Sequence, residues 1–180
     1  MFNAFNRGVN FQLVADWAKL GDPTDRTLSI VVRSDLADSV RSMADLRGRT
    51  FAVGGAVIPG AYLSLVVYSP EFAQRPDVAT RWMVAYLQGV RDYWAAFHEQ
   101  KDRDAAIAVL SERLSLKDPR VWETASPEFM DLNGRIDAAR LGQQAAFFQR
   151  EGTLTGDLPD LNRFIDPQFA EGAVRQIGAR

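Results

Sequence analysis

The chain has 180 residues, of which 47% are hydrophobic and 24% are charged, and its 21 basic and 23 acidic side chains leave a net charge of −2. This composition excludes a wholly disordered chain, and the lack of a basic excess argues against a protein that binds nucleic acid through a cationic face. The absence of cysteine excludes disulfides, thiolate nucleophiles and cysteine-bound metals.

The first third of the chain predicts short elements. Residues 9–20 form an amphipathic segment whose apolar side chains recur at helical spacing. Residues 27–33 and 50–54 are rich in β-branched and apolar side chains, a pattern typical of strands buried on both faces of a parallel sheet. One helical turn is expected at residues 42–46, and a third strand at residues 62–68.

Helices are expected throughout the rest of the chain. The clearest pattern covers residues 77–98, where a wide apolar arc runs from Trp82 to Phe97 and His98 lies near the helix end. Further helices are expected at residues 105–114, after Asp118, at 136–150 and at 166–177. Three similar motifs predict helix starts, because Ser or Asp caps free amides and Pro suits the first helical position: Ser69-Pro70, Ser126-Pro127 and Asp166-Pro167.

Three stretches of the chain carry more specific patterns. One is the valine-rich segment at residues 30–36, followed at residues 43–53 by the pattern Ala-Asp-Leu-Arg-Gly-Arg and a strand. The others are residues 3–16 and the helical sequences from residue 68 onward. These stretches resemble the ABC-transporter solute-binding proteins of the nitrate/sulfonate/taurine type, in which residues 3–16 resemble an early segment and the sequences from residue 68 resemble the C-terminal helices. The matches touch most of the chain.

The resemblance implies an α/β, helix-rich fold with a small, mostly parallel sheet, like one lobe of a type II periplasmic binding protein. The whole chain, 1–180, is expected to form this single lobe-like domain, with part of the sheet in residues 1–60 and a return strand plus the C-terminal helices in residues 61–180. The family places most of its second lobe where this chain has only residues 55–61, so a truncated form is expected.

The implied function is that of the solute-binding component of an ABC importer for a small organic or inorganic anion, with an ABC permease as partner. It implies a periplasmic or extracytoplasmic location, whereas the N-terminal residues show no signal peptide, which would leave the chain as given in the cytoplasm. Such proteins trap a solute between two lobes, so one lobe alone is expected to bind weakly. No enzyme activity, cofactor, metal or nucleic-acid partner is expected.

Ligands of open α/β sheets sit outside the carboxyl ends of the strands, which indicates where a solute would bind. Arg33 could pair with an anion there, and Gly54 and Gly55 could offer amides. The resemblance adds two asparagines near the N-terminus. The complete set of candidate ligand-binding residues is Asn3, Asn6, Arg33, Ser34, Gly54, Gly55, Tyr68 and Ser69.

Two functions of other kinds stay open. The chain could be a helix-rich protein–protein interaction module, in which an exposed apolar surface binds a partner or a second copy, or it could be a non-functional remnant. An enzyme similar to those of thiamine-pyrimidine synthesis is disfavoured, because that chemistry needs histidine and cysteine at the site. The chain has a single histidine, His98, and no cysteine.

Overall fold

The structure, a computed structural model, describes residues 1–20, 32, 34–48, 60–116, 118, 121–122 and 127–180. Within these residues, short helical elements accompany two strands and four longer helices. In chain order the elements are α1 (Phe2–Asn6), β1 (Gln12–Lys19), η1 (Ser34–Leu36), η2 (Met43–Leu46), β2 (Tyr62–Tyr68), α2 (Pro70–Ala73), α3 (Pro76–Phe97), α4 (Arg103–Leu114), α6 (Ala138–Arg150), η3 (Leu161–Arg163) and α7 (Gln168–Ile177).

β1 and β2 pair as an antiparallel ladder, in which Gln12 stands opposite Tyr68 and Lys19 opposite Tyr62. The helical spacing that the sequence suggested for residues 9–20 is therefore wrong, since most of this segment is a strand. Four consecutive side chains of β1, from Leu13 to Asp16, are buried, which an element packed on both faces allows and a surface helix does not.

The chain is α/β and helix-rich, as expected, but the described sheet is not mostly parallel. Its two strands run antiparallel, and the parallel contact among the described residues is a single bridge between Leu13 and Ile165. Two strands on which that expectation rested, at residues 27–33 and 50–54, lie outside the described residues apart from Val32.

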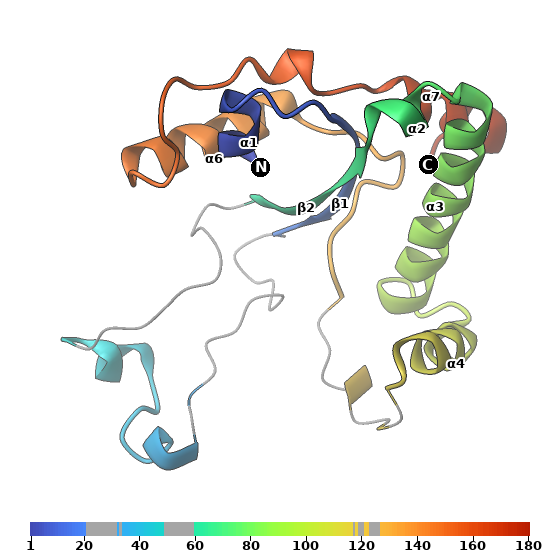
Figure 1. Ribbon diagram of the computed structural model, residues 1–180. Coiled ribbons are helices and arrows are strands. Elements are labelled where there is room, and N and C mark those ends of the chain that lie inside the picture. The colour runs from blue at the N-terminus through green and yellow to red at the C-terminus, as the bar shows by residue number, and fades with distance from the viewer. Residues whose placement is uncertain (21–31, 33, 49–59, 117, 119–120, 123–126) are drawn as a thin grey trace.

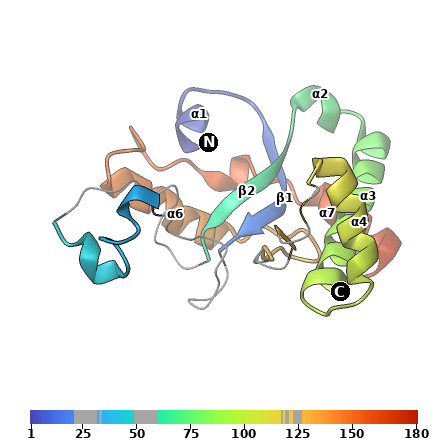
Figure 2. The same ribbon diagram turned by 90° about the horizontal axis from the view of Figure 1, so that it is seen from below.

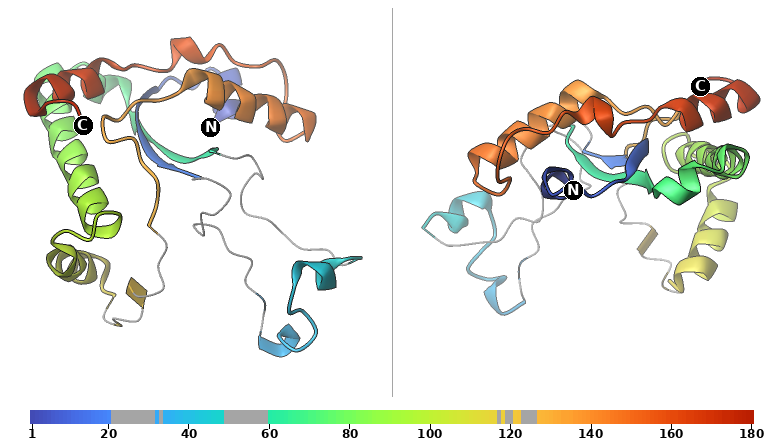
Figure 3. Two further views of the ribbon diagram at one scale, coloured as in Figure 1. Left: turned by 180° about the vertical axis from the view of Figure 1, so that it is seen from behind. Right: turned by 45° about the horizontal axis from the view of Figure 1, so that its top comes forward.

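The ladder lies between two apolar clusters, so side chains on both of its faces are buried. α3 and α7 cover one side, and α1 and α6 cover the other (Figures 1 and 3). The first cluster consists of Val14, Ala15, Val66, Tyr68, Ala79, Met83, Leu87, Phe169 and Ala173. The second consists of Phe2, Phe5, Leu13, Tyr62, Leu141, Ala145, Leu154 and Leu161.

The long helices confirm the sequence pattern. α3, α4, α6 and α7 each begin and end within three residues of the expected bounds, and η2 occupies the turn expected at residues 42–46. Met83, Leu87 and Val90 of the apolar arc are buried, whereas Trp82 stays 45% exposed. His98 follows the last residue of α3, as expected, and its ring stacks on Trp94 at a centroid distance of 3.9 Å.

One of the three expected helix starts is confirmed in full: the Ser69 hydroxyl accepts the Phe72 amide at 3.2 Å, and Pro70 is the first residue of α2. The second is confirmed in part, because Asp166 Oδ1 accepts the Gln168 amide but Pro167 lies just before the first residue of α7. The third expectation is wrong for the residues that the structure describes, because residues 127–131 form no helix. Phe129 instead bridges to Lys19 of β1, so backbone pairing with the ladder takes the place of helical hydrogen bonds. Ser126 and most of the helix expected after Asp118 lie outside the described residues.

Candidate functional site

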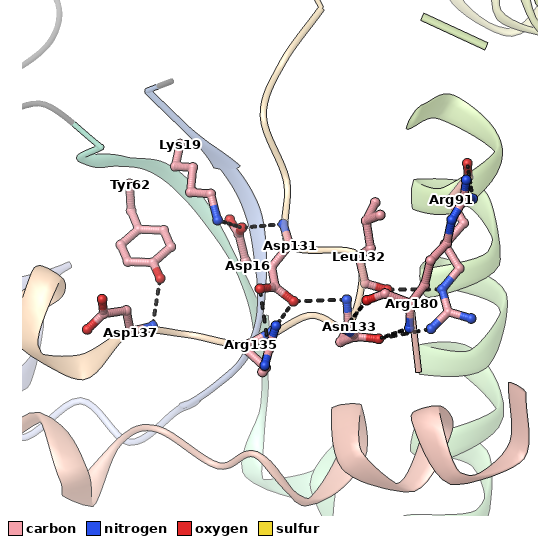
Figure 4. A network of polar contacts seen from close by, with 10 residues as sticks. All are labelled: Asp16, Lys19, Tyr62, Arg91, Asp131, Leu132, Asn133, Arg135, Asp137 and Arg180. Atoms are coloured by element: carbon pink, nitrogen blue, oxygen red, sulfur yellow. Dashed lines mark hydrogen bonds and ion pairs between the residues drawn. The ribbon is translucent and has the colours of Figure 1, made fainter. Parts of the chain in front are cut away.

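Charged and polar side chains gather where β1 ends and β2 begins, beside the loop that leads into α6 (Figure 4). The loop is tied to the ladder by the Lys19 amide, which donates to the Phe129 carbonyl at 3.0 Å. We call this group the ladder-end cluster and define it as Asp16, Lys19, Tyr62, Asp131, Arg135, Asp137 and Arg140.

Asp16 is the buried centre of the cluster. Its side chain is fully buried, Oδ2 accepts the Asp131 amide at 2.7 Å, and Lys19 Nζ lies 3.4 Å from the same oxygen. Among the described residues, Oδ1 has no hydrogen-bond partner. Burial raises the pKa of Asp16 above its ordinary value of 3.8, and the charge of Lys19 opposes that shift. Asp16 therefore holds both the loop and the Lys19 ammonium in place.

Asp131 organises the loop in a similar way. Its Oδ1 accepts the amides of Asn133 and Arg135 at 2.9 and 3.1 Å, while Oδ2 lies 3.4 Å from Arg135 Nε. The Asp131 side chain is only 18% exposed, but that of Arg135 is 76% exposed. The carboxylate is thus mostly buried, and the guanidinium is mostly exposed.

The first turn of α6 closes the cluster. Asp137 caps the helix by accepting the Arg140 amide at 3.1 Å, and this hydrogen bond holds the pKa of Asp137 below its usual value. The Asp137 amide donates to the Tyr62 hydroxyl at 2.7 Å, which ties the helix start to β2.

Arg140 reaches from α6 to the backbone just before β2. Its Nη1 donates to the Gly60 carbonyl at 3.2 Å. Gly60 has a positive φ of 71°, and a Cβ there would lie 1.4 Å from the same nitrogen. Only glycine fits this approach without displacing the guanidinium. Gly60 and Arg140 therefore fix the backbone directly before β2.

The cluster contains three cations and three carboxylates, and each cation lies within ion-pair distance of a carboxylate. Lys19, Arg135 and Arg140 border an open cavity of about 610 Å³, which Asp131 and Asp137 also line, and Arg135 is the most exposed of the three cations. Two of these cations have guanidinium groups, which suit oxyanions. Such an arrangement can hold a small anion. No group of three or more His, Asp or Glu side chains that could hold a metal ion occurs in the described part of the chain.

The residues expected from the sequence do not come together at this place. The side chains of Asn3 and Asn6 bind the loop after α6: Asn3 donates to the Thr153 carbonyl and accepts the Thr155 amide, and Asn6 donates to the carbonyls of Thr155 and Asp157. Their amide groups hold the protein's own backbone, which explains the polar pair within an apolar N-terminal segment.

Some of the ligand-binding candidates near the strand ends make contacts that support the fold, and the others lie outside the described residues. Tyr68 is buried and donates its hydroxyl to the Ala79 carbonyl at 2.9 Å, and Ser69 caps α2. Ser34 begins η1. The remaining candidates, Arg33, Gly54 and Gly55, lie outside the described residues.

Sequence reasoning missed the ladder-end cluster, although one signal was present. Asp16 is the single charged residue in an apolar run from Leu13 to Ala18, where an acid is unfavourable unless the fold supplies partners. The contacts of Asp131, Arg135 and Arg140 depend on a loop whose path no local pattern indicates.

Comparisons with known proteins add no relative: no family model, no curated protein and no solved structure matches the chain. Within the described residues, every helix is too short or too polar to cross a lipid bilayer.

Proposed function

We propose that this chain is one lobe of a solute-binding protein of an ABC importer and that it takes a small organic or inorganic anion, of the nitrate, sulfonate or taurine type, at the ladder-end cluster. The observation that supports the proposal is that Lys19, Arg135 and Arg140 border one open cavity, into which the 76% exposed Arg135 guanidinium gives the most accessible positive charge, although Asp131 and Asp137 line the same cavity. In this proposal the lobe belongs to the type II periplasmic-binding fold.

The position of the cluster supports the proposal. Lys19 and Tyr62 stand opposite each other, so residues 20–61 leave and re-enter the ladder at one point. Solute-binding proteins hold their ligand where two lobes meet, and a second wall would join this lobe at that point. A single open wall leaves one side of the anion in water. We therefore expect a dissociation constant of about 1–10 mM, equivalent to roughly 3–4 kcal/mol of binding free energy.

Calorimetric titration of the full chain with nitrate, sulfate and taurine at low ionic strength tests the proposal. Arg135→Gln should weaken binding of the best ligand about threefold to fivefold, because Arg135 is exposed beside the cavity and its loss costs up to about 1 kcal/mol of charge attraction. The matched control is Arg113→Gln, at an exposed arginine of α4 that does not line the cavity, and it should leave binding unchanged. Equal effects of the two substitutions would contradict the assignment of the site.

A protein–protein interaction module is the second candidate function. Two large apolar side chains of the ladder favour it, since Trp17 is 54% and Val67 is 47% exposed. The Trp82–Phe97 arc supports it less, because Met83, Leu87 and Val90 are buried within the chain itself. An interaction surface would therefore lie on the ladder.

A further inference from the structure

Residues 178–180 follow α7 and lie beside α3 (Figures 1 and 2), and we call them the strap. Two side chains hold the backbone of the strap. The Arg180 amide donates to Asn133 Oδ1 at 2.9 Å, and Asn133 Nδ2 donates back to the Arg180 carbonyl at 2.6 Å. Arg91 of α3 donates from Nη2 to the Gly178 carbonyl at 2.7 Å. The strap is therefore docked on both α3 and the loop that contains Asn133.

Arg91 joins the strap to the loop of residues 131–135 (Figure 4). Its Nε donates to the Leu132 carbonyl at 3.0 Å, and its Nη2 lies 3.1 Å from Asn133 Oδ1. Among the described residues, the oxygens that Arg91 binds belong to backbone carbonyls and one side-chain amide. A partly buried guanidinium that loses such acceptors is left with unpaired donors, which is unfavourable. The loop and the strap thus depend on one shared cation.

The loop carries this docking to Arg135 through Asp131. Asp131 Oδ1 accepts the amides of both Asn133 and Arg135, so the loop is one hydrogen-bonded turn. On the side of the ladder, Asp16 Oδ2 accepts the Asp131 amide, and the Asp16 amide donates to the Gly134 carbonyl at 3.3 Å. The strap adds an attachment on the side of α3. Displacement of Asn133 would therefore reach Arg135 through their shared acceptor.

Gly178 is the residue at which the chain turns from α7 into the strap. Its φ of 79° and ψ of 160° lie in a region of backbone conformation that is essentially limited to glycine. A Cβ at Gly178 would meet no atom within 4 Å. Alanine at this position would therefore disfavour the docked strap through the backbone alone, without disturbing a side-chain contact.

We propose that the strap is a positioning element of the anion site: its docking on Arg91 and Asn133 fixes the loop and, with it, the Arg135 guanidinium at the cavity. The Arg180 guanidinium strengthens the docking, because its Nη2 donates to both carboxylate oxygens of Glu99, just after α3, at 2.8 Å. The effect on anion binding rests on the proposed function, whereas the docking of the loop does not.

Amide hydrogen exchange of the full chain, measured by nuclear magnetic resonance, tests the docking. Gly178→Ala should speed exchange at Asn133 and Arg135 about tenfold, because a strained strap undocks more often. The matched control is Gly8→Ala, since Gly8 also has a positive φ, of 75°, and open space around a Cβ, but lies outside the strap and the loop. It should leave both amides unchanged. An effect of Gly178→Ala no larger than that of the control would overturn the proposal.

Anion titration separates positioning from a merely structural role. For the ligand that binds best in calorimetry, Gly178→Ala should raise the dissociation constant about twofold to threefold, because it displaces the Arg135 guanidinium without removing it. Gly8→Ala should leave the dissociation constant unchanged. Faster exchange with unchanged anion binding would refute the positioning role. If no anion binds to the natural chain, the anion site is refuted, and faster exchange in Gly178→Ala still supports the docking of the loop by the strap.

Asn133→Ala reaches the same undocked state by another route, because it removes both hydrogen bonds to the Arg180 backbone. Two substitutions that release one strap should not act additively. In the double variant with Gly178→Ala, exchange at Arg135 should therefore exceed the larger single effect by no more than about twofold. Asn133→Ala also tests the docking if Gly178→Ala fails to fold by circular dichroism. Effects that multiply in the double variant would contradict a shared strap.

Discussion

Replacing Gln144 by leucine isolates the hydrogen bonds that fasten α6 to β2. The Gln144 side chain is buried, and its amide group satisfies both backbone groups of Tyr62. Leucine has a similar volume, so Gln144→Leu removes the two hydrogen bonds while largely preserving the packing. The Tyr62 amide and carbonyl are then left without a partner at a place where few alternatives exist.

The expected loss follows from these two backbone groups. A buried polar group without a partner costs about 1–3 kcal/mol, which gives about 2–6 kcal/mol for the pair. Gln144 also lines the open groove along β2, and water entering from that groove can replace part of what is lost. We therefore expect Gln144→Leu to lower the free energy of unfolding by about 2–4 kcal/mol, in the lower part of that range.

Urea unfolding followed by circular dichroism measures this difference, provided that the denaturant dependence of the two proteins is the same. The matched control is Gln143→Leu, at the neighbouring exposed position of the same helix, which should change the free energy of unfolding by no more than about 0.5 kcal/mol. If Gln144→Leu costs no more than the control, the bonds to Tyr62 do not fasten the two elements, and the reasoning is refuted.

Three further substitutions probe the ladder-end cluster. Gly60→Ala should lower the free energy of unfolding by about 1–2 kcal/mol because of the positive φ of Gly60 and its contact with Arg140. In the double variant with Arg140→Ala, measured by the same urea unfolding, the loss should be smaller than the sum of the losses in the two single variants. Asp137→Ala should cost about 1 kcal/mol by removing the cap of α6, as thermal or urea unfolding would show, and a change below 0.3 kcal/mol would count against the cap. Folding raises the pKa of Asp16, so the folded state binds its proton more tightly than the unfolded chain does. The stabilising contribution of Asp16 should therefore be greatest in acid and decline as the pH rises from 3.8 through the raised pKa, and this decline should vanish in Asp16→Asn when unfolding is measured across that range.

The sequence predicts well the elements whose signal lies in neighbouring residues, either as a long periodic pattern or as a short capping motif. The apolar arc of α3 repeats over about four turns. The Ser69 and Asp166 motifs place a side-chain acceptor within three residues of the amide that it binds. The sequence of β1 suggests a helix because a short segment that is buried on both faces lacks the alternation of apolar and polar side chains by which a strand is distinguished.

The candidate site was predictable only in part, because its contacts span the chain. Asp16 and Asp131 are separated by 115 positions, and the Tyr62–Gln144 pair by 82. An isolated acid in an apolar strand indicates that a partner must exist, but not which one. Asn3 and Asn6 illustrate the converse, since polar residues that suggested a ligand site instead bind the backbone of a distant loop.

The most direct measurement of the anion-binding proposal is a nuclear magnetic resonance titration of the full chain with the ligand that binds best in calorimetry. We predict that the largest amide shifts will occur at Lys19, Tyr62, Asp131 and Arg135, with half-saturation in the millimolar range. Shifts that concentrate on α1 and the loop bound by Asn3 and Asn6, or that spread evenly over exposed arginines, would contradict the assignment of an anion site to the ladder-end cluster.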